Sequence, residues 1–278
     1  RDGENFEVTA KSNNVSAPDG LVVDAAKVKD EAFSQIKITG AQSVIDRIAY
    51  VVAETDVNDT ISETTDFDGN IALFDHEGKI IDSSYVFLSF DTAKITVPIS
   101  MKKEVPVVVT FENAPKDNPI KATPSVKTVV VKGPQQVIEK LKSVELEPIN
   151  FADITPDATE FVQKIRMPDS IESSDGNVEI TVKLEMKGIT YKNIVVTNSS
   201  FKPQNVTQGL TATMDSFTVK VIGQSSALKG ITADDIVVSA DLKSYSKGEH
   251  SGVPVTVKLV NKSSAWVAGV YTADIKQS

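Results

Sequence analysis

The sequence contains no cysteine and a single tryptophan, and both scarcities narrow the functions that it can have. Without cysteine the chain has no disulfide, no thiolate nucleophile, no iron–sulfur cluster and no cysteine-ligated zinc. Aromatic residues make up only 6% of the 278 residues. Val, Ile and Thr recur instead, and their stiff, branched side chains favour β-strands.

Basic residues are too few to balance the acidic ones. The chain has 29 Lys and Arg against 38 Asp and Glu, which gives a net charge of −9. This charge disfavours binding to nucleic acids or to an anionic membrane surface. No apolar run approaches the roughly 18–20 residues that span a bilayer, and no signal peptide is visible. Because the chain begins at Arg1 rather than Met, we expect any membrane anchor to lie outside it.

A pattern of strand, glycine and short helix occurs three times. The glycines are Gly40, Gly133 and Gly223, which are 133 − 40 = 93 and 223 − 133 = 90 residues apart. Such a regular period indicates copies of one folding unit. The expected strands and helices are Ile36–Gly40 with 41–48, Val129–Gly133 with 134–141, and Val219–Gly223 with 224–231.

Local chemistry suggests how this motif turns from strand to helix. We expect each glycine to adopt backbone angles that other residues avoid. Pro134 suits the first helical position, where its missing N–H has no partner to lose. The helices should bury one apolar face, formed by Val44, Ile45 and Ile48 in the first copy and by Val137, Ile138 and Leu141 in the second.

Other residues and expected strands recur with the same period. An acid or amide follows each glycine by 16, 17 or 18 residues, at Asp56, Asn150 and Asp241. Each copy is expected to open with a strand, at 6–10, 105–111 and 193–197. Later strands alternate apolar and polar residues at 95–99, 178–184 and 253–259. Such alternation is typical of antiparallel strands with one buried face.

The sequence therefore predicts a mainly β protein of three tandem β-rich domains, each with a short helix after the strand–glycine turn. The predicted boundaries are 1–100, 101–189 and 190–278. The junctions at 100–104 and 186–188 contain no flexible Gly/Ser linker. We expect a semi-rigid, elongated array in which each repeat contacts only its neighbours.

These residues resemble the YbbR-domain family. The resemblance covers the whole chain as three YbbR-like repeats and rests on the motif segments Thr39-Gly40, Lys132-Gly133-Pro134 and Ile222-Gly223, and on opening strands such as Val105-Pro106-Val107. It implies tandem domains outside the membrane of Gram-positive bacteria, tethered by an N-terminal helix that is absent from this chain. It also implies a protein partner, a CdaA-like membrane diadenylate cyclase that makes cyclic di-AMP.

No catalytic, cofactor-binding or metal-binding residue is predicted. His76 and His250 fall in expected turns of different repeats, so a shared triad or metal site is disfavoured. Asp66–Asn70 has oxygen ligands around a glycine, but its spacing fails the calcium-loop pattern and favours a turn. No phosphate loop or G-x-S-x-G elbow is present. The serine after Gly223-Gln224 is expected to be a helix N-cap.

Trp266 has two interpretations. We favour packing on the last strands of the third repeat, because aromatic side chains supply much of a small core; the alternative is an exposed anchor for a partner. Five N-x-[ST] sequons indicate only a polar surface; they lie at Asn14, Asn58, Asn198, Asn205 and Asn261.

These expectations favour a non-catalytic, extracytoplasmic regulator that changes a partner's activity by contact. Binding of the cell wall or another envelope ligand is an alternative, which predicts a concave pocket with converging polar groups. An enzyme with a pair of carboxylates is a second alternative. A surface adhesin with immunoglobulin-like repeats is a third, although that fold lacks the glycine-then-helix motif.

Overall fold

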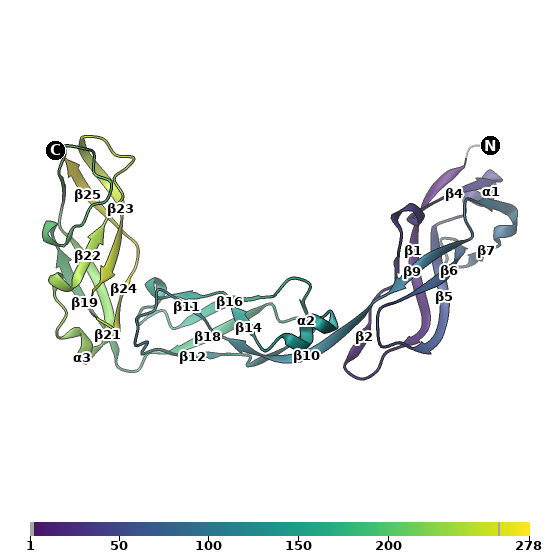
Figure 1. Cartoon of the computed structure of the whole chain (residues 1–278), viewed down its shortest axis with the longest axis horizontal. Coiled ribbons are helices and arrows are strands. Elements are labelled where there is room, and N and C mark those ends of the chain that lie inside the picture. Colours follow the sequence, from purple (N-terminus) through teal and green to yellow (C-terminus); the bar gives the residue numbers. More distant parts are fainter. Residues whose placement is uncertain (1–2, 261) are drawn as a thin grey trace. The chain divides into compact units, whose positions relative to one another are not determined.

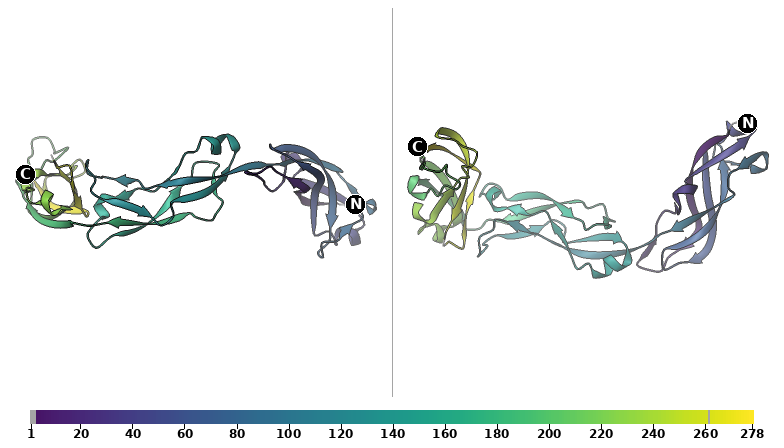
Figure 2. Two further views of the ribbon diagram at one scale, coloured as in Figure 1. Left: turned by 90° about the horizontal axis from the view of Figure 1, so that it is seen from below. Right: turned by 45° about the horizontal axis from the view of Figure 1, so that its top comes forward.

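The computed structural model describes residues 3–260 and 262–278, and β-strands dominate it (Figure 1). The predicted mainly β fold is confirmed, and the two further views in Figure 2 show the same predominance of strands. The chain forms two compact units. Unit 1 comprises Arg1–Val105, Val130–Lys142 and Pro168–Gly176, and unit 2 comprises Pro106–Val129, Ser143–Met167 and Asn177–Ser278. The boundaries of the three repeats stay a prediction.

Unit 1 is built mainly on one sheet with the strand order β3-β9-β6-β5-β1-β4-β8, and β7 pairs with β6. Its core contains Ile36, Ile38, Val51 and Ile95, all fully buried. The predicted alternation over 95–99 is confirmed, because Ile95, Val97 and Ile99 are buried. The elements are β1 (Glu4–Ser16), β2 (Leu21–Val23), β3 (Lys27–Val28), β4 (Gln35–Gly40), α1 (Gln42–Ile45), β5 (Tyr50–Thr60), β6 (Thr65–Phe74), β7 (Ile80–Ile81), β8 (Val86–Leu88) and β9 (Thr92–Val97).

Unit 1 also contains the start of the second repeat. Strand β2 pairs antiparallel with the first residues of β10 (Ile99–Val108), where Leu21 lies opposite Met101. The end of β13 (Thr128–Gly133) pairs with β17 (Glu172–Ser173), and α2 (Gln135–Lys140) follows β13. The first repeat is therefore joined to the start of the second by backbone hydrogen bonds as well as by the chain.

Unit 2 holds the rest of the second repeat and the third. Its antiparallel strands β12, β18, β16 and β14 lie side by side, and the third repeat forms the sheets β19-β21-β24 and β20-β25-β23-β22. Branched residues such as Val219, Val221 and Ile236 fill the core of the third repeat. The elements are β11 (Phe111–Glu112), β12 (Lys121–Pro124), β14 (Val144–Leu146), β15 (Ile149–Asn150), η3 (Phe151–Asp153), β16 (Glu160–Arg166), β18 (Glu179–Glu185), β19 (Ile189–Val196), β20 (Ala212–Met214), β21 (Phe217–Gln224), α3 (Ser225–Leu228), β22 (Ile236–Ser239), β23 (Gly248–Leu259), β24 (Ala265–Ala268) and β25 (Tyr271–Gln277).

The strand–glycine–helix motif has the same chain path at all three places. It is β4 and α1 in the first copy, β13 and α2 in the second, and β21 and α3 in the third. In the first two copies the opening strand then pairs in parallel with the chain after the helix, as Val8 with Val51 and Val107 with Val144. In the third copy an isolated parallel bridge joins Phe201, which follows the opening strand, to Val238. Parallel neighbours need a crossover connection, and the motif strand and its helix supply it.

The motif glycines are required by close packing and not by unusual backbone angles, which corrects the expectation from the sequence. None of the three has a left-handed φ. A Cβ at each would instead lie too close to a backbone carbonyl oxygen just before the edge strand that pairs with the motif. These oxygens belong to Tyr85 (3.2 Å from the Cβ), Ser170 (2.8 Å) and Ser264 (3.2 Å).

The helices differ in detail from their predicted form. Pro134 is the N-cap of α2 rather than its first residue. The N-cap of α3 is Gln224, so the predicted serine cap is wrong. Ile138 is fully buried but Val137 is 39% exposed. A helix this short presents too little of its circumference to the sheet to bury every apolar side chain.

An asparagine with a left-handed backbone conformation lies beside each parallel pairing, and its role was not predicted from the sequence. Asn14, Asn113 and Asn205 have φ values of 53°, 56° and 53°. Each side-chain amide donates to the acid or amide that follows the motif glycine, namely Asp56 (3.1 Å), Asn150 (3.2 Å) and Asp241 (2.8 Å). Asparagine tolerates this backbone region better than most residues. These sequon asparagines at 14 and 205 thus have a structural function.

Candidate functional site

The carboxylates of Asp66–Asn70 lie on strand β6, so the predicted turn is wrong. The Asp66 carboxylate accepts from Lys29 at 2.5 Å and from the Thr96 hydroxyl at 2.6 Å. Asp68 pairs with Lys94 at 3.0 Å. These ion pairs join β6 to neighbouring chain segments on an exposed face. The acidic run therefore has cation partners within the protein and needs no metal to balance its charge.

The two histidines lie in different structural environments. His76 lies in the predicted hairpin turn, where the Asp75 carboxylate accepts from two backbone N–H groups, and it is exposed. His250 lies in strand β23, so its predicted turn is wrong. The Nε2 atom of His250 is 2.8 Å from the Ser246 carbonyl oxygen, and its ring packs edge-on against Tyr245. No group of three or more His, Asp or Glu that could hold a metal occurs among residues 3–260 and 262–278.

A charged cluster in unit 1 joins the end of the first repeat to the start of the second. The Lys132 ammonium lies 2.8 Å from an Asp24 carboxylate oxygen and 2.7 Å from a Glu172 carboxylate oxygen. The Ser100 hydroxyl also donates to Asp24. Lys132 directly precedes the motif glycine, and the pairing of β13 with β17 places Glu172 opposite it. Lys132 belongs to the predicted motif, but its partners Asp24 and Glu172 were not predicted from the sequence.

The cluster stabilises the charged forms of Asp24 and Lys132. Burial raises the pKa of Asp24, but hydrogen bonds from Lys132 and Ser100 outweigh this effect and hold the pKa below its usual range. The hydrogen bond to Asp24, followed by that to Glu172, raises the pKa of Lys132. Because this pair is largely screened from solvent, its attraction is stronger than that of a fully exposed ion pair.

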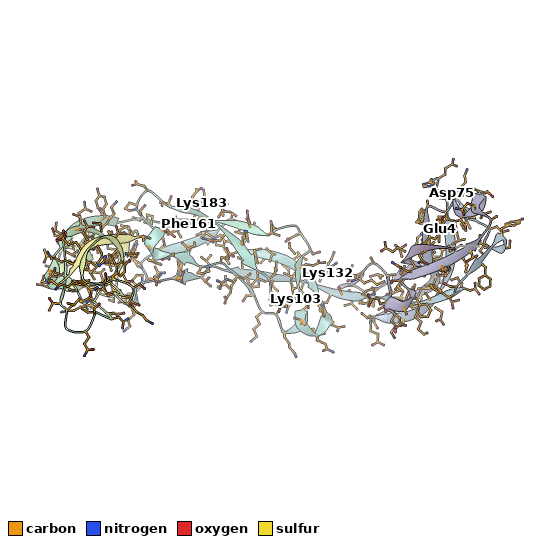
Figure 3. All side chains as sticks on the ribbon, turned by 90° about the horizontal axis from the view of Figure 1, so that it is seen from above. Glu4, Asp75, Lys103, Lys132, Phe161 and Lys183 are labelled. Carbon is orange, nitrogen blue, oxygen red and sulfur yellow. The ribbon has the colours of Figure 1, made fainter. Side chains whose placement is uncertain are left out.

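The second and third motif helices each have a lysine near their C-terminal end, and the first does not. The Lys103 ammonium, labelled beside α2 in Figure 3, lies 2.7 Å from the carbonyl oxygen of Leu141 at the end of that helix. Lys192 lies 2.7 Å from the Ile231 carbonyl oxygen after α3. Cations stabilise helix ends of this polarity. The strand pairing places Glu4 at the equivalent position of the first repeat, where it accepts from Gln42 instead.

Trp266 lies in unit 2 and joins the third repeat to the end of the second. Its ring packs edge-on against Phe151 with centroids 5.0 Å apart, and its indole N–H donates to the Ile154 carbonyl oxygen at 3.0 Å. Only 4% of Trp266 is exposed, and Phe151 is fully buried. The Gly269 N–H also donates to the Ala152 carbonyl oxygen at 2.8 Å. Trp266 is thus an anchor whose partner lies in the same chain, which neither sequence-based interpretation anticipated.

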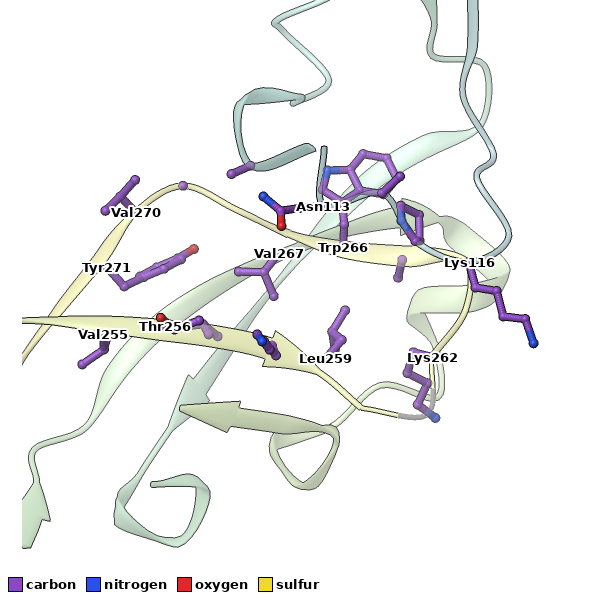
Figure 4. Close-up of a pocket in the computed structure, with 17 residues that line it drawn as sticks. Asn113, Lys116, Val255, Thr256, Leu259, Lys262, Trp266, Val267, Val270 and Tyr271 are labelled. Atoms are coloured by element: carbon purple, nitrogen blue, oxygen red, sulfur yellow. The ribbon is translucent and has the colours of Figure 1, made fainter. Parts of the chain in front are cut away.

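A groove of about 530 Å³ lies beside this contact (Figure 4). One wall is the loop that starts at Asn113, and the other is formed by side chains of β23, β24 and β25, including Val255, Val267 and Tyr271. Lys116, Lys258 and Lys262 line the same groove. The groove therefore combines apolar side chains with cationic ones.

Comparison with known proteins gives a match in the middle of the chain. Residues 105–192 match the family model described as YbbR-like protein. A crystal structure of a YbbR-like protein from Streptococcus pneumoniae TIGR4 is 14% identical, and the alignment covers 64% of this chain and 94% of that chain with a TM-score of 0.24. No curated protein matches the chain. In the described ranges, no helix is long and apolar enough to cross a membrane.

Proposed function

We propose that the chain is a non-catalytic regulatory segment that works by protein contact outside the cytoplasm, on the basis of the match of residues 105–192 to the YbbR-like family model. Its partner is a membrane diadenylate cyclase, and its effect is a change in the rate of cyclic di-AMP synthesis. The family match carries this proposal. YbbR-like proteins are not a known enzyme family.

The use of charged side chains supports contact rather than chemistry. A general acid or base needs a carboxylate or imidazole that faces a substrate cleft. The acidic groups at Asp24, Asp66 and Asp235 are instead hydrogen-bonded to lysines or to backbone N–H groups, which hold their pKa values down. Groups held in the ionised form by structural partners serve the architecture of the strands and their junctions.

A regulator of this kind acts only through a difference in affinity for two states of its partner. Exposed side chains supply the contact area that such a difference requires. Apolar residues with more than half of their surface exposed lie on several strands, including Phe87, Val162 and Val195. Contact with the outward-facing segments of the cyclase would favour one of its states, and the nucleotide chemistry would stay with the cyclase.

Co-purification tests the partner directly. The chain, tethered to the outer face of the membrane by a fused helix, is expressed with a membrane diadenylate cyclase, and each protein is isolated through its own tag. We expect the two to purify together in mild detergent. An unrelated β-rich domain on the same tether is the control. Recovery of the cyclase with both proteins, or with neither, contradicts the proposal.

Binding of an envelope polymer is the second candidate, and the groove beside Trp266 favours it. Its valine and tyrosine side chains and its three lysines fit an anionic polymer that also has apolar groups. Titration calorimetry with soluble wall fragments tests this candidate. Heat that disappears when Lys116, Lys258 and Lys262 are replaced by Ser supports it, and an unchanged heat in that variant excludes the groove.

A further inference from the structure

The third repeat leaves one strand edge open beside the groove of Figure 4. Strand β23 pairs with β25 as far as Val255 and with β22 from Thr256 to Leu259. Among the described residues, no strand pairs with the other edge of β23 after Val255. Strand β24 follows β23 in the chain but belongs to a different sheet. Both strands line the groove, which therefore runs along an unpaired edge of β23.

The backbone groups of Val257 and Leu259 face the groove. The Val260 N–H donates to the Asp235 carbonyl oxygen at 2.8 Å, so Val260 faces β22. Backbone groups of successive residues in a strand point to opposite edges, so Lys258 also faces β22, whereas Val257 and Leu259 face away from it. No described backbone group on that side bonds to either residue. An unpaired edge of this kind is a template for a further strand.

The first repeat fills the same place with its own strand β7. Leu73 of β6 corresponds to Leu259, because the strand partner of each lies five residues before the acid that follows the motif glycine (56 − 51 = 5 and 241 − 236 = 5). Leu73 pairs with Ile81 of β7 on the side away from β5. Leu73 is 1% exposed and Ile81 is 5% exposed, whereas Leu259 is only partly buried. An added strand therefore completes the burial of this leucine in the first repeat.

The third repeat lacks the segment that forms β7. Phe74 and Val260 follow the two leucines, and Val86 and Ala265 are equivalent because each pairs with its motif glycine. Between these positions the first repeat has 86 − 74 − 1 = 11 residues and the third has 265 − 260 − 1 = 4. Four residues are too few for a hairpin turn, a returning strand and the step to the edge strand. The place of β7 is therefore open to a segment from another molecule.

The side chains around the open edge define what such a segment must carry. Val257 and Leu259 pack partly buried side chains on the core of the third repeat, so their neighbours on an added strand must be apolar. Lys258 lies on the opposite, exposed face, and Lys116 also lines the groove. Neither lysine forms an ion pair with a described residue, whereas Lys262 has a carboxylate oxygen 3.3 Å away. Carboxylates opposite such lysines stabilise a strand pair.

We propose that an extended segment of a protein partner, with alternating apolar and acidic side chains, binds in this groove as a strand antiparallel to β23, as β7 lies against β6. In binding of this kind the backbone hydrogen bonds supply affinity and the alternate side chains supply specificity. Such a contact rests on the proposed function and deepens it, because it gives the protein partner a place and a chemistry. A second copy of this chain fits less well, since pairing two β23 edges brings lysines of like charge together.

Hydrogen exchange of the full chain with a synthetic peptide tests the proposal. The probe is a peptide of alternating valine and glutamate. The Val257 and Leu259 amides should exchange fast in the free chain and about a hundredfold more slowly at a peptide concentration about a hundred times Kd. The Lys258 amide, which faces β22, should not change and is the internal reference. Peptides of alternating valine and lysine, or serine and glutamate, should bind roughly fivefold more weakly or worse.

Val257→Pro removes the N–H that faces the groove and leaves the hydrogen bonds to β22 in place. Strand β23 already contains Pro254. The substitution should weaken peptide binding by roughly tenfold or more. Val257→Ala is the matched control, because it keeps the N–H and should bind more tightly than the proline variant. If the proline variant does not fold, residues 75–85 in place of 261–264 supply a copy of β7, which should abolish peptide binding.

The proposal is overturned if the valine–glutamate peptide does not slow exchange at Val257 and Leu259, or if the proline and alanine variants bind it equally. Slowing by soluble wall fragments but not by the peptide would overturn it and assign the groove to an envelope polymer. Self-association that Val257→Pro abolishes would also overturn it, because the occupant would then be a second copy. No cyclase is present in this assay. Co-purification of the cyclase without peptide binding would therefore contradict the groove alone, and the reverse result would contradict the cyclase alone.

Discussion

Replacing Trp266 by Ala should weaken the contact between the third repeat and the end of the second. Trp266 is 4% exposed, packs on Phe151 and donates to Ile154. Truncation of a buried tryptophan to alanine usually costs about 3–5 kcal/mol. That range includes about 1 kcal/mol for the ring pair and about 1 kcal/mol for the hydrogen bond. We expect a loss of about 4 kcal/mol in the free energy that holds the contact closed.

Hydrogen exchange of the Gly269 amide measures this free energy, because its bond to Ala152 breaks when the contact opens. A 4 kcal/mol loss corresponds to about a thousandfold faster exchange if opening limits it. The core of the third repeat does not include Trp266, so amides of buried β21 should stay protected. Circular dichroism should show the β content unchanged.

Phe87→Ala is the matched control, because it truncates the aromatic residue at the equivalent position of the first repeat. Phe87 is 74% exposed, so its truncation should change stability by less than about 0.5 kcal/mol. Equal effects of the two substitutions, or a Trp266→Ala chain whose Gly269 exchange is unchanged, would refute the reasoning.

Three further substitutions test other contacts. Asp24→Asn should make stability less sensitive to acid. Because the pKa of Asp24 is lowered in the folded protein, its carboxylate stabilises the fold above the unfolded-state pKa of about 4, and this stabilisation is lost as pH falls through the folded-state pKa. The raised pKa of Lys132 gives the opposite loss above about pH 10; urea melts at pH 3, 7 and 10.5 check both. Gly133→Ala should cost about 1–3 kcal/mol in thermal unfolding, since its Cβ would lie 2.8 Å from a carbonyl oxygen, whereas Gly230→Ala, in open space, should be neutral or slightly stabilising; equal effects would contradict the packing argument. Asn205→Ala should cost about 1–2 kcal/mol for its left-handed backbone, and Asn205→Gly less; a glycine variant as unstable as the alanine variant would show that backbone strain is not the cause.

Local patterns in the sequence predicted the parts of the fold that depend on short-range order. The alternation of Ile95, Val97 and Ile99 predicted their burial, and the period of the glycines predicted the repeated strand-to-helix path. These features depend on the spacing of side chains along one strand or helix, which the sequence states directly.

Contacts between distant segments were harder to predict. The motif glycines are needed because the chain just before an edge strand passes close by. The close carbonyl oxygens, of Tyr85, Ser170 and Ser264, lie 85 − 40 = 45, 170 − 133 = 37 and 264 − 223 = 41 residues further along. The acidic run at Asp66 resembled a turn because its cation partner, Lys29, lies 37 residues earlier. Pairing over such distances is decided by the sheet, which composition and spacing do not specify.

Trp266 illustrates the same limit at the junction between repeats. Its burial followed from the general behaviour of aromatic residues, but its partner Phe151 lies in the preceding repeat. The equivalence of Trp266, Glu172 and Phe87 becomes visible only when each is aligned by its strand partner. The three equivalent positions thus differ in exposure, and only Trp266 is covered by another repeat.

The proposed function is that this chain changes the activity of a membrane partner by contact and performs no chemistry itself. A membrane diadenylate cyclase in sealed vesicles, with its catalytic domain outside and this chain enclosed on the opposite side, tests it most directly. The account predicts that the rate of cyclic di-AMP synthesis changes and saturates as the enclosed concentration of the chain rises, and that an unrelated β-rich domain has no effect. A rate that is the same with and without the chain would contradict it.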